Sequence, residues 1–380
     1  MNHYILPKNN HEFKICPQIQ SDIIEPYTSN SLLKSYKSIL NEIDSIKKYS
    51  GEQFNESFNL INTYEYIFSI IPELNISIIK FDIKNAVFYE LYEILNCLNI
   101  FDCYVNSINA FYICKNPTEL ITCHNILRKD NSDFIISSEN INNNITDIDI
   151  RKYDFIFYEI NNSVNDSNDS NDSNELNNYT TQLLQILRVI LLHQTNKGSC
   201  IIKISHIFYK PIIDILYIFC SLFEKVSIIK PSVSNIATFE KYIVCSKFIL
   251  PKEKRLLYNN YIISIDLFLS EYNSSQNINS IILDILPCFF INKIDDINII
   301  FGQQQLETID QMINILKNKN KDEKLDFLKK NNIQKSIIWC EKYKLPHNKI
   351  QEKPNIFLPL KNDKADELNE NLENIIINNK

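Results

Sequence analysis

Glycine is almost absent from this chain. The 380 residues include only three glycines, whereas average usage would give roughly 25. A binding loop that needs several glycines, so that bare backbone can approach a ligand, is therefore not expected here. The rest of the composition is that of a globular protein, since 44% of the residues are hydrophobic. The length allows one large domain or two modest ones.

Paired cysteines and membrane-spanning runs are also missing from the sequence. The ten cysteines form no CxxC pair, and the group that lies closest together fits no zinc-ligand spacing. That group is Cys97, Cys103, Cys114, Cys123 and His124. The first residues lack the pattern of a signal peptide, and no uninterrupted apolar run reaches transmembrane length. The sequence therefore predicts a cytoplasmic protein with buried, reduced thiols, no metal site and no membrane contact.

The net charge of −7 argues against a protein that coats RNA with a generally basic surface, although a local basic groove remains open. Lysines are concentrated towards the C-terminus, where they form either a solvated flank or a surface that faces RNA. They are Lys317, Lys319, Lys321, Lys324, Lys329 and Lys330.

Segments of strand and helix character alternate through the middle of the chain. Strands are expected at Asn75–Phe81, Ser107–Cys114, Phe134–Ser137, Tyr153–Glu159, Gly198–Ile204, Val226–Lys230 and Tyr242–Phe248. Helices are expected between them at Asn85–Leu98, Tyr179–His193 and Ile207–Phe223. This alternation predicts an α/β fold with a mostly parallel sheet flanked by helices.

The two flanks of this region have helical periodicity. Helices are expected at Ser31–Tyr49, Glu52–Ile70, Leu256–Glu271, Gln303–Lys317 and Asp322–Tyr343. We therefore expect an N-terminal helical region (1–74), an α/β domain (75–250), a helical C-terminal region (251–360) and a polar tail (361–380). Residues 161–178 repeat the triplet Asn-Asp-Ser, which predicts a disordered insertion.

Two charged residues stand out within the apolar strands. Lys203 lies inside one strand and Glu240 lies at the head of another. An unpaired buried charge is costly, so neither is an obvious choice for structure alone. If the two strands are neighbours, the two side chains are expected to pair.

Several motifs surround these two residues in a fixed order. They resemble the C-terminal half of FtsJ-like (RrmJ-type) RNA 2'-O-methyltransferases, particularly the cap-methylating branch. A similar C-terminal extension accompanies FtsJ-like proteins of large DNA viruses. The resemblance implies a Rossmann-like methyltransferase fold, S-adenosylmethionine as cofactor, and RNA, including capped mRNA, as partner. The motifs are Ile202-Lys203-Ile204, Phe223-Glu224-Lys225-Val226, Lys230-Pro231-Ser232-Val233-Ser234 and Phe239-Glu240-Lys241-Tyr242-Ile243-Val244-Cys245.

The family uses a Lys-Asp-Lys-Glu tetrad, in which a lysine of tuned pKa takes the ribose proton or stabilises the forming alkoxide. The resemblance places Lys203 at the central lysine and Glu240 at the terminal glutamate. Glu159 takes the place of the aspartate, with one additional methylene.

The first lysine of the tetrad has no counterpart in the best register, because Glu90 takes its place. An acid at this position would reverse the local electrostatics. Lys80 or Lys84 could substitute only if the alignment shifts.

The cofactor loop departs further from the family, which has Ala/Cys-Glu-Gly-Pro-Gly-Gly-Phe after the first core strand. Only the proline of that pattern is kept, and every glycine is replaced, so that side chains occupy the place of the ligand. The corresponding residues here are Cys114, Lys115, Asn116, Pro117, Thr118 and Glu119.

Three functions remain open. The favoured hypothesis is a catalytically inactive FtsJ-like homologue that binds RNA or a partner capping enzyme, with a basic groove near Lys203 and Lys230. The second is an active mRNA cap 2'-O-methyltransferase with an unusual cofactor loop. The third is a structural or assembly subunit without a role in nucleic-acid binding.

Overall fold

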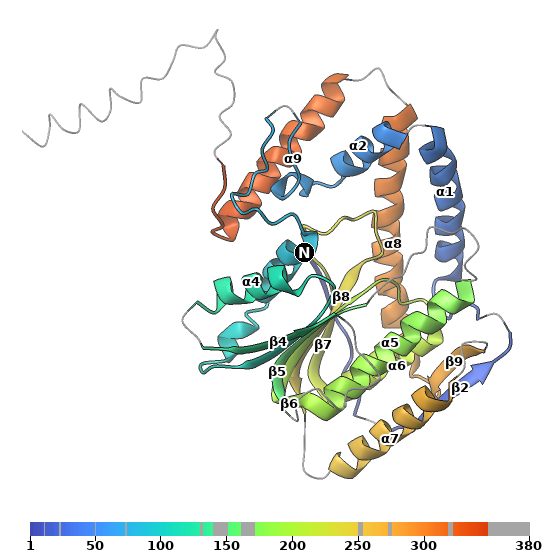
Figure 1. Ribbon diagram of the computed structural model, residues 1–380. Helices are drawn as coiled ribbons and strands as arrows, with labels where there is room; N and C mark the ends of the chain where they lie inside the picture. Colours follow the sequence, from blue (N-terminus) through green and yellow to red (C-terminus); the bar gives the residue numbers. More distant parts are fainter. Residues whose placement is uncertain are drawn as a thin grey trace, which may run out of the picture.

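The computed structural model of this chain describes residues 1–10, 12–22, 24–49, 51–72, 74–129, 132–139, 151–160, 172–249, 254–272, 276–317 and 322–348. Within these ranges the chain forms one seven-stranded sheet with helices on both faces, and a separate two-stranded sheet (Figure 1). The predicted α/β fold is confirmed.

Five strands of the main sheet run in the same direction. β4, β3, β5 and β6 pair in parallel, and β7 points the same way because β8 is antiparallel to both β6 and β7. β1 is antiparallel to β7 and forms one edge. The expected mostly parallel sheet is thus present, with two reversed strands. In spatial order the strands are β1 (Asn2–Ile5), β7 (Phe223–Lys230), β8 (Lys241–Phe248), β6 (Gln194–Ile204), β5 (Tyr153–Glu159), β3 (Asn109–Ile113) and β4 (Phe134–Ser138).

The strand side chains alternate between two cores, because successive residues of a strand point to opposite faces of the sheet. On β3, Phe111 and Ile113 join the core that also holds α5, α6 and α7, whereas Ala110 and Tyr112 join the core with α3, α4 and α9. The helices of the first core are α5 (Asp172–His193), α6 (Lys210–Leu222) and α7 (Arg255–Glu271). Those of the second are α3 (Ala86–Cys97), α4 (Pro117–Leu127) and α9 (Asp322–Lys342).

Three more helices pack beside the sheet: α1 (Asn30–Tyr49), α2 (Gly51–Ile61) and α8 (Cys288–Lys317) (Figure 1). α8 begins fifteen residues before the helix predicted at Gln303, because polar residues in its first half bond to the rest of the protein. Asn298 is buried, and its Nδ2 donates to Thr28 Oγ1 (3.1 Å) and to the carbonyl of Ile207 (3.0 Å). Gly302 lies so close to Leu32 of α1 that a Cβ would sit 2.2 Å from its Cδ2.

The second sheet, β2 (Ile15–Gln20) with β9 (Asn277–Ile282), was not expected from the sequence. A fully buried aspartate of α6 fixes it to the rest of the fold. Asp214 pairs with Lys210 Nζ (2.9 Å) and accepts hydrogen bonds from the backbone of Ile281 (2.8 Å) and Ile282 (3.2 Å). The two terminal regions, which were predicted to be helical, therefore contain strands as well. β1 and β2 lie in the N-terminal region, and β9 lies in the C-terminal region.

The predicted strand at Asn75–Phe81 is wrong. The backbone amides of Ile78 and Ile79 donate to Tyr66 and Ile67 rather than to a neighbouring strand. Asn75 has a φ of 58° and ends the turn between Ile71 and Ile76. Ile78 and Ile79 are buried in the α3 core, whereas Ile76 is 41% exposed, so the apolar residues give a strand-like pattern without a strand.

The low-complexity insertion predicted at 161–178 overlaps the start of α5. Residues 161–171 lie outside the described residues, whereas 172–178 are helical. The helix extends this far because Asn177 is buried against β9. Its Nδ2 donates to the carbonyl of Gln276 (3.2 Å), and its Oδ1 accepts from the amide of Ile278 (3.0 Å).

The cysteines and the histidine that lie closest in sequence do not converge on one point. His124 is buried in a hydrogen-bonded chain instead, with Nδ1 at 2.8 Å from Tyr112 Oη and Nε2 at 2.8 Å from Asp133 Oδ2. Arg128 Nε also donates to Asp133 (2.7 Å). In the described part of the chain we find no cluster of three or more metal-ligating side chains, and all ten cysteines are unpaired. No described helix is long and apolar enough to cross a membrane.

Candidate functional site at the carboxyl ends of β3, β5 and β6

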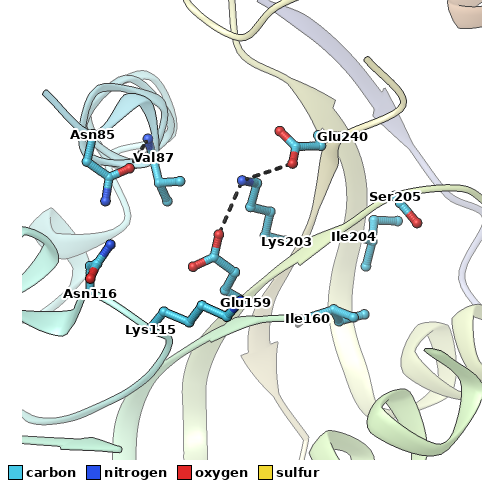
Figure 2. Close-up of a pocket in the computed structure, with 10 residues that line it drawn as sticks. All are labelled: Asn85, Val87, Lys115, Asn116, Glu159, Ile160, Lys203, Ile204, Ser205 and Glu240. Atoms are coloured by element: carbon cyan, nitrogen blue, oxygen red, sulfur yellow. Dashed lines mark hydrogen bonds and ion pairs between the residues drawn. The ribbon is translucent and has the colours of Figure 1, made fainter. Parts of the chain in front are cut away.

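A pocket of about 210 Å³ opens where β3, β5 and β6 end (Figure 2). β3 connects to β4 on one side, and the next described strand, β5, lies on its other side. This is the crevice at which open α/β sheets bind their ligands. The pocket is lined by Asn85, Val87, Lys115, Asn116, Glu159, Ile160, Lys203, Ile204, Ser205 and Glu240.

The sheet register brings the charged residues of this pocket together. Glu159 of β5 lies opposite Lys203 of β6, and Lys203 lies opposite Tyr242 of β8. The three side chains therefore form one row on the face that α3 covers. Lys203 Nζ is 3.2 Å from Glu159 Oε1 and 3.3 Å from Glu240 Oε1 (Figure 2). Lys203 and Glu240, which were expected to pair, do pair.

A third carboxylate approaches from α3. Glu90 is only 3% exposed, and Tyr242 Oη donates a 2.5 Å hydrogen bond to its Oε2. The start of α3 is fixed by Asn85, whose side chain accepts the amide of Val87 (3.0 Å) as an N-cap. Glu90 thus lies beside the Lys203 cluster, as the best register with the family predicted, and no lysine stands in its place.

The three acids determine the protonation state of Lys203. Burial alone would lower the pKa of Lys203, but the negative charges of Glu90, Glu240 and Glu159 outweigh it and raise the pKa above the ordinary value of 10.5. Burial raises the pKa of Tyr242 well above its usual range, and the same carboxylates raise it further. At neutral pH the lysine is therefore charged and has no free electron pair with which to take a proton.

The favoured hypothesis expected a basic groove near Lys203 and Lys230, but Lys230 does not line an open groove. It is 6% exposed, and its Nζ donates to the carbonyls of Thr238 (2.5 Å) and Glu240 (3.1 Å). Burial lowers its pKa to about 8, with a further decrease from Lys203 and an opposing effect of Glu90 and Glu240. Lys230 therefore anchors the loop that carries Glu240.

The predicted cofactor loop is compact. α4 begins at Pro117, directly after Asn116, which has φ −121° and ψ 72°. Positive φ occurs at none of residues 114–119, all of which the structure describes. Of the six predicted cofactor residues only Lys115 and Asn116 line the pocket. Cys114 is buried, which raises its pKa to about 12, and Thr118 and Glu119 belong to the first turn of α4.

The two alternatives for the first tetrad lysine lie elsewhere. Lys80 lines a separate hollow beside the end of α9, and Lys84 is exposed and does not line the pocket of Lys203. Sequence reasoning missed Tyr242, which connects Glu90 to the strand row. Its signal was a tyrosine one strand away from an embedded lysine, inside an otherwise apolar run.

One family model matches part of this chain. A family model described as "Poxvirus mRNA capping enzyme, small subunit" matches residues 133–258. A comparison with curated proteins found no match. Among solved structures, a ribosomal RNA methyltransferase from Plasmodium falciparum is 17% identical, with a TM-score of 0.34, and the match covers 44% of this chain and 100% of that one. Over the residues that carry Glu159, Lys203 and Glu240, this chain is therefore similar to the small subunit of the poxvirus mRNA capping enzyme.

Proposed function

We propose that this chain is a methyltransferase-like subunit of an mRNA capping enzyme that does not itself transfer a methyl group. Its role is then to bind a large capping subunit, a partner that the name of the matching family implies. The observation that carries the proposal is that Lys203 Nζ is occupied by Glu159 (3.2 Å) and Glu240 (3.3 Å), with the buried acid Glu90 beside them. A 2'-O-methyltransferase needs a group that takes the ribose proton or a lysine free to stabilise the alkoxide.

The size and shape of the pocket support the same proposal. Its volume of about 210 Å³ is below the roughly 300–1,000 Å³ of typical cofactor pockets. α4 begins three residues after Cys114, so the chain turns into a helix where the family has its glycine loop. Lys115 and Asn116 place side chains at the pocket wall (Figure 2). These residues do not form the bare backbone surface that S-adenosylmethionine would need.

An active cap 2'-O-methyltransferase is the second candidate, and one observation favours it. Glu159, Lys203 and Glu240 keep a compact arrangement at the end of the sheet, where the charged lysine could face an alkoxide. Two observations count against this candidate. Glu90 takes the place of the first lysine, and the residues after β3 turn directly into α4. A purely structural subunit remains the third reading.

Isothermal titration of the full-length chain with S-adenosylmethionine tests the proposal. We expect no binding heat at cofactor concentrations up to about 1 mM, because the closed loop and small pocket exclude the ligand. A low-micromolar dissociation constant, with methyl transfer to capped RNA, would establish the enzyme instead. In that case Lys203→Ala should abolish transfer and leave cofactor affinity nearly unchanged.

The partner is tested separately by mixing the chain with the large capping subunit from the same source. We expect a stable complex in size-exclusion chromatography. Separate elution of the two proteins at micromolar concentrations would refute the assembly role, whatever the cofactor titration shows.

A further inference from the structure

The exposed face of α9 is basic although the protein as a whole is acidic. Side chains three to four residues apart lie on the same side of a helix, and α9 carries along one such side a series of exposed residues. They are Lys324, Phe327, Lys330, Gln334, Lys335, Ile338, Glu341 and Lys342. Four lysines lie here with one glutamate, and a second exposed acid, Asp326, borders them one turn before Lys330, on a chain whose net charge is −7. This group is called the α9 face below.

An aromatic ring stands within this basic series. Phe327 is 73% exposed, so its ring is accessible to a ligand at the surface. It lies between Lys324 and Lys330, one helical turn from each. Ile338, which is 53% exposed, adds apolar surface further along.

The opposite side of α9 is firmly anchored, so the exposed face has a fixed orientation. Trp339 is buried, and its Nε1 donates to Glu93 of α3 (3.1 Å). Asn332 is also buried, and its Nδ2 donates to the carbonyl of Leu60 at the end of α2 (2.7 Å). The lysines and Phe327 are therefore presented by a rigid element rather than by a mobile tail.

The basic surface continues beyond the end of α9 into a hollow of about 650 Å³. Its lining includes Lys80, Lys344 and His347 together with one acid, Glu341. The chain after α9 is fixed here, because the amide of Lys80 donates to the carbonyl of Pro346 (3.0 Å) and Ile79 forms a β-bridge with His347. The hollow lies apart from the pocket of Lys203, and the two share no lining residue.

We propose that the α9 face and this hollow bind the phosphate backbone of single-stranded RNA, with a base stacked on Phe327. Lysines match the charge of the phosphates, and an exposed aromatic ring among them is how proteins hold unpaired bases. A duplex would hide its base faces from Phe327. The inference does not depend on the proposed function, because it uses no residue of the Lys203 site.

The test measures binding of a fluorescein-labelled oligouridylate to the full-length chain by fluorescence anisotropy over a range of salt concentrations. Phe327→Ala is expected to weaken binding about tenfold, the usual loss for one stacked base. The triple variant Lys324→Ala/Lys330→Ala/Lys335→Ala removes three phosphate contacts. It should reduce the slope of log K against log salt by about 2.

The matched control removes the same charge at three exposed lysines elsewhere, as Lys14→Ala/Lys129→Ala/Lys225→Ala. This variant should retain the wild-type slope. An equal loss in both triple variants would show a net-charge effect only and overturn the proposal. So would wild-type affinity in the α9 variants, or no RNA binding by the wild-type chain.

A protein partner on this face is distinguished by repeating the chromatography with the large capping subunit. If the α9 variants keep RNA affinity and lose that complex, the face belongs to the protein partner and the RNA proposal is wrong. Titration with S-adenosylmethionine is unaffected by either outcome, so the two proposals can fail separately.

Discussion

Replacement of Lys203 by methionine is expected to lower the free energy of unfolding by about 3–5 kcal/mol, the usual cost of removing one partner from a buried ion cluster. Methionine fills a similar space but leaves Glu90 and Glu159 without the cation that balances them. Urea denaturation at neutral pH measures the loss. A residue kept only for a former reaction would have no such effect.

Two further variants separate charge from packing at this position. Lys203→Arg keeps the charge and should cost much less than Lys203→Met. The double variant Lys203→Met/Glu90→Gln removes one of the unbalanced acids, so it should recover about 0.5–3 kcal/mol through coupling between neighbours. Strict additivity of the two single changes would contradict the electrostatic account.

Glu93→Ala is expected to destabilise the fold by about 3–5 kcal/mol. The side chain is 1% exposed, and its oxygens accept the amides of Ser232 (3.0 Å) and Val233 (3.2 Å) and the indole N–H of Trp339 (3.1 Å). Each buried donor left without an acceptor costs about 1–3 kcal/mol. Denaturant unfolding measures the change.

Trp339 is the only tryptophan, so its fluorescence reports locally on the same variant. Its emission should move to longer wavelength in Glu93→Ala, because water would reach the indole N–H. Glu93→Gln, which keeps one acceptor oxygen, should lose less stability. Glu12→Ala, at an exposed position, should stay within about 0.5 kcal/mol of wild type. Equal stability of Glu93→Ala and Glu12→Ala would contradict the role of Glu93.

The central strands could be predicted from the sequence because their signal is local. β5 to β8 each contain an apolar run that is buried on both faces. The embedded charge of Lys203 pointed to the site, since a buried lysine requires acids nearby. The pairing of Lys203 with Glu240 was expected if their strands are neighbours, and β6 and β8 are neighbours.

The missed elements depend on partners that are distant in sequence. β1 pairs with β7, and β2 with β9, more than 200 residues away in each case. β1 and β9 contain asparagines, which are rare in strands, and no local pattern reveals their partners. Asn75–Phe81 shows the opposite error, since its apolar pattern resembles a strand but Ile76 and Ile79 form only isolated bridges.

In the site, sequence reasoning could name charged residues but could not determine their protonation. The place of Glu90 was identified from the order of motifs. Its effect on Lys203 depends on the burial of α3 and on the hydrogen bond from Tyr242, which only the fold provides. Lys230 was mistaken for a groove residue because it bonds to the backbone carbonyls of Thr238 and Glu240, and a sequence does not show which backbone groups a side chain reaches.

The protonation state of Lys203 is the centre of this account, and ¹⁵N NMR of the lysine Nζ as a function of pH measures it directly. The Glu90, Glu240 and Glu159 charges should keep Lys203 protonated up to a pKa above the ordinary 10.5. A lysine whose pKa is raised on folding contributes its full stabilisation at any pH below its unfolded-state pKa. That stabilisation is lost as the pH rises through the folded-state pKa. The resonance, assigned by its absence in Lys203→Arg, should therefore remain that of an ammonium group at pH 10.5. Titration near neutral pH would instead identify a lysine able to act as a base and would contradict the non-catalytic assignment.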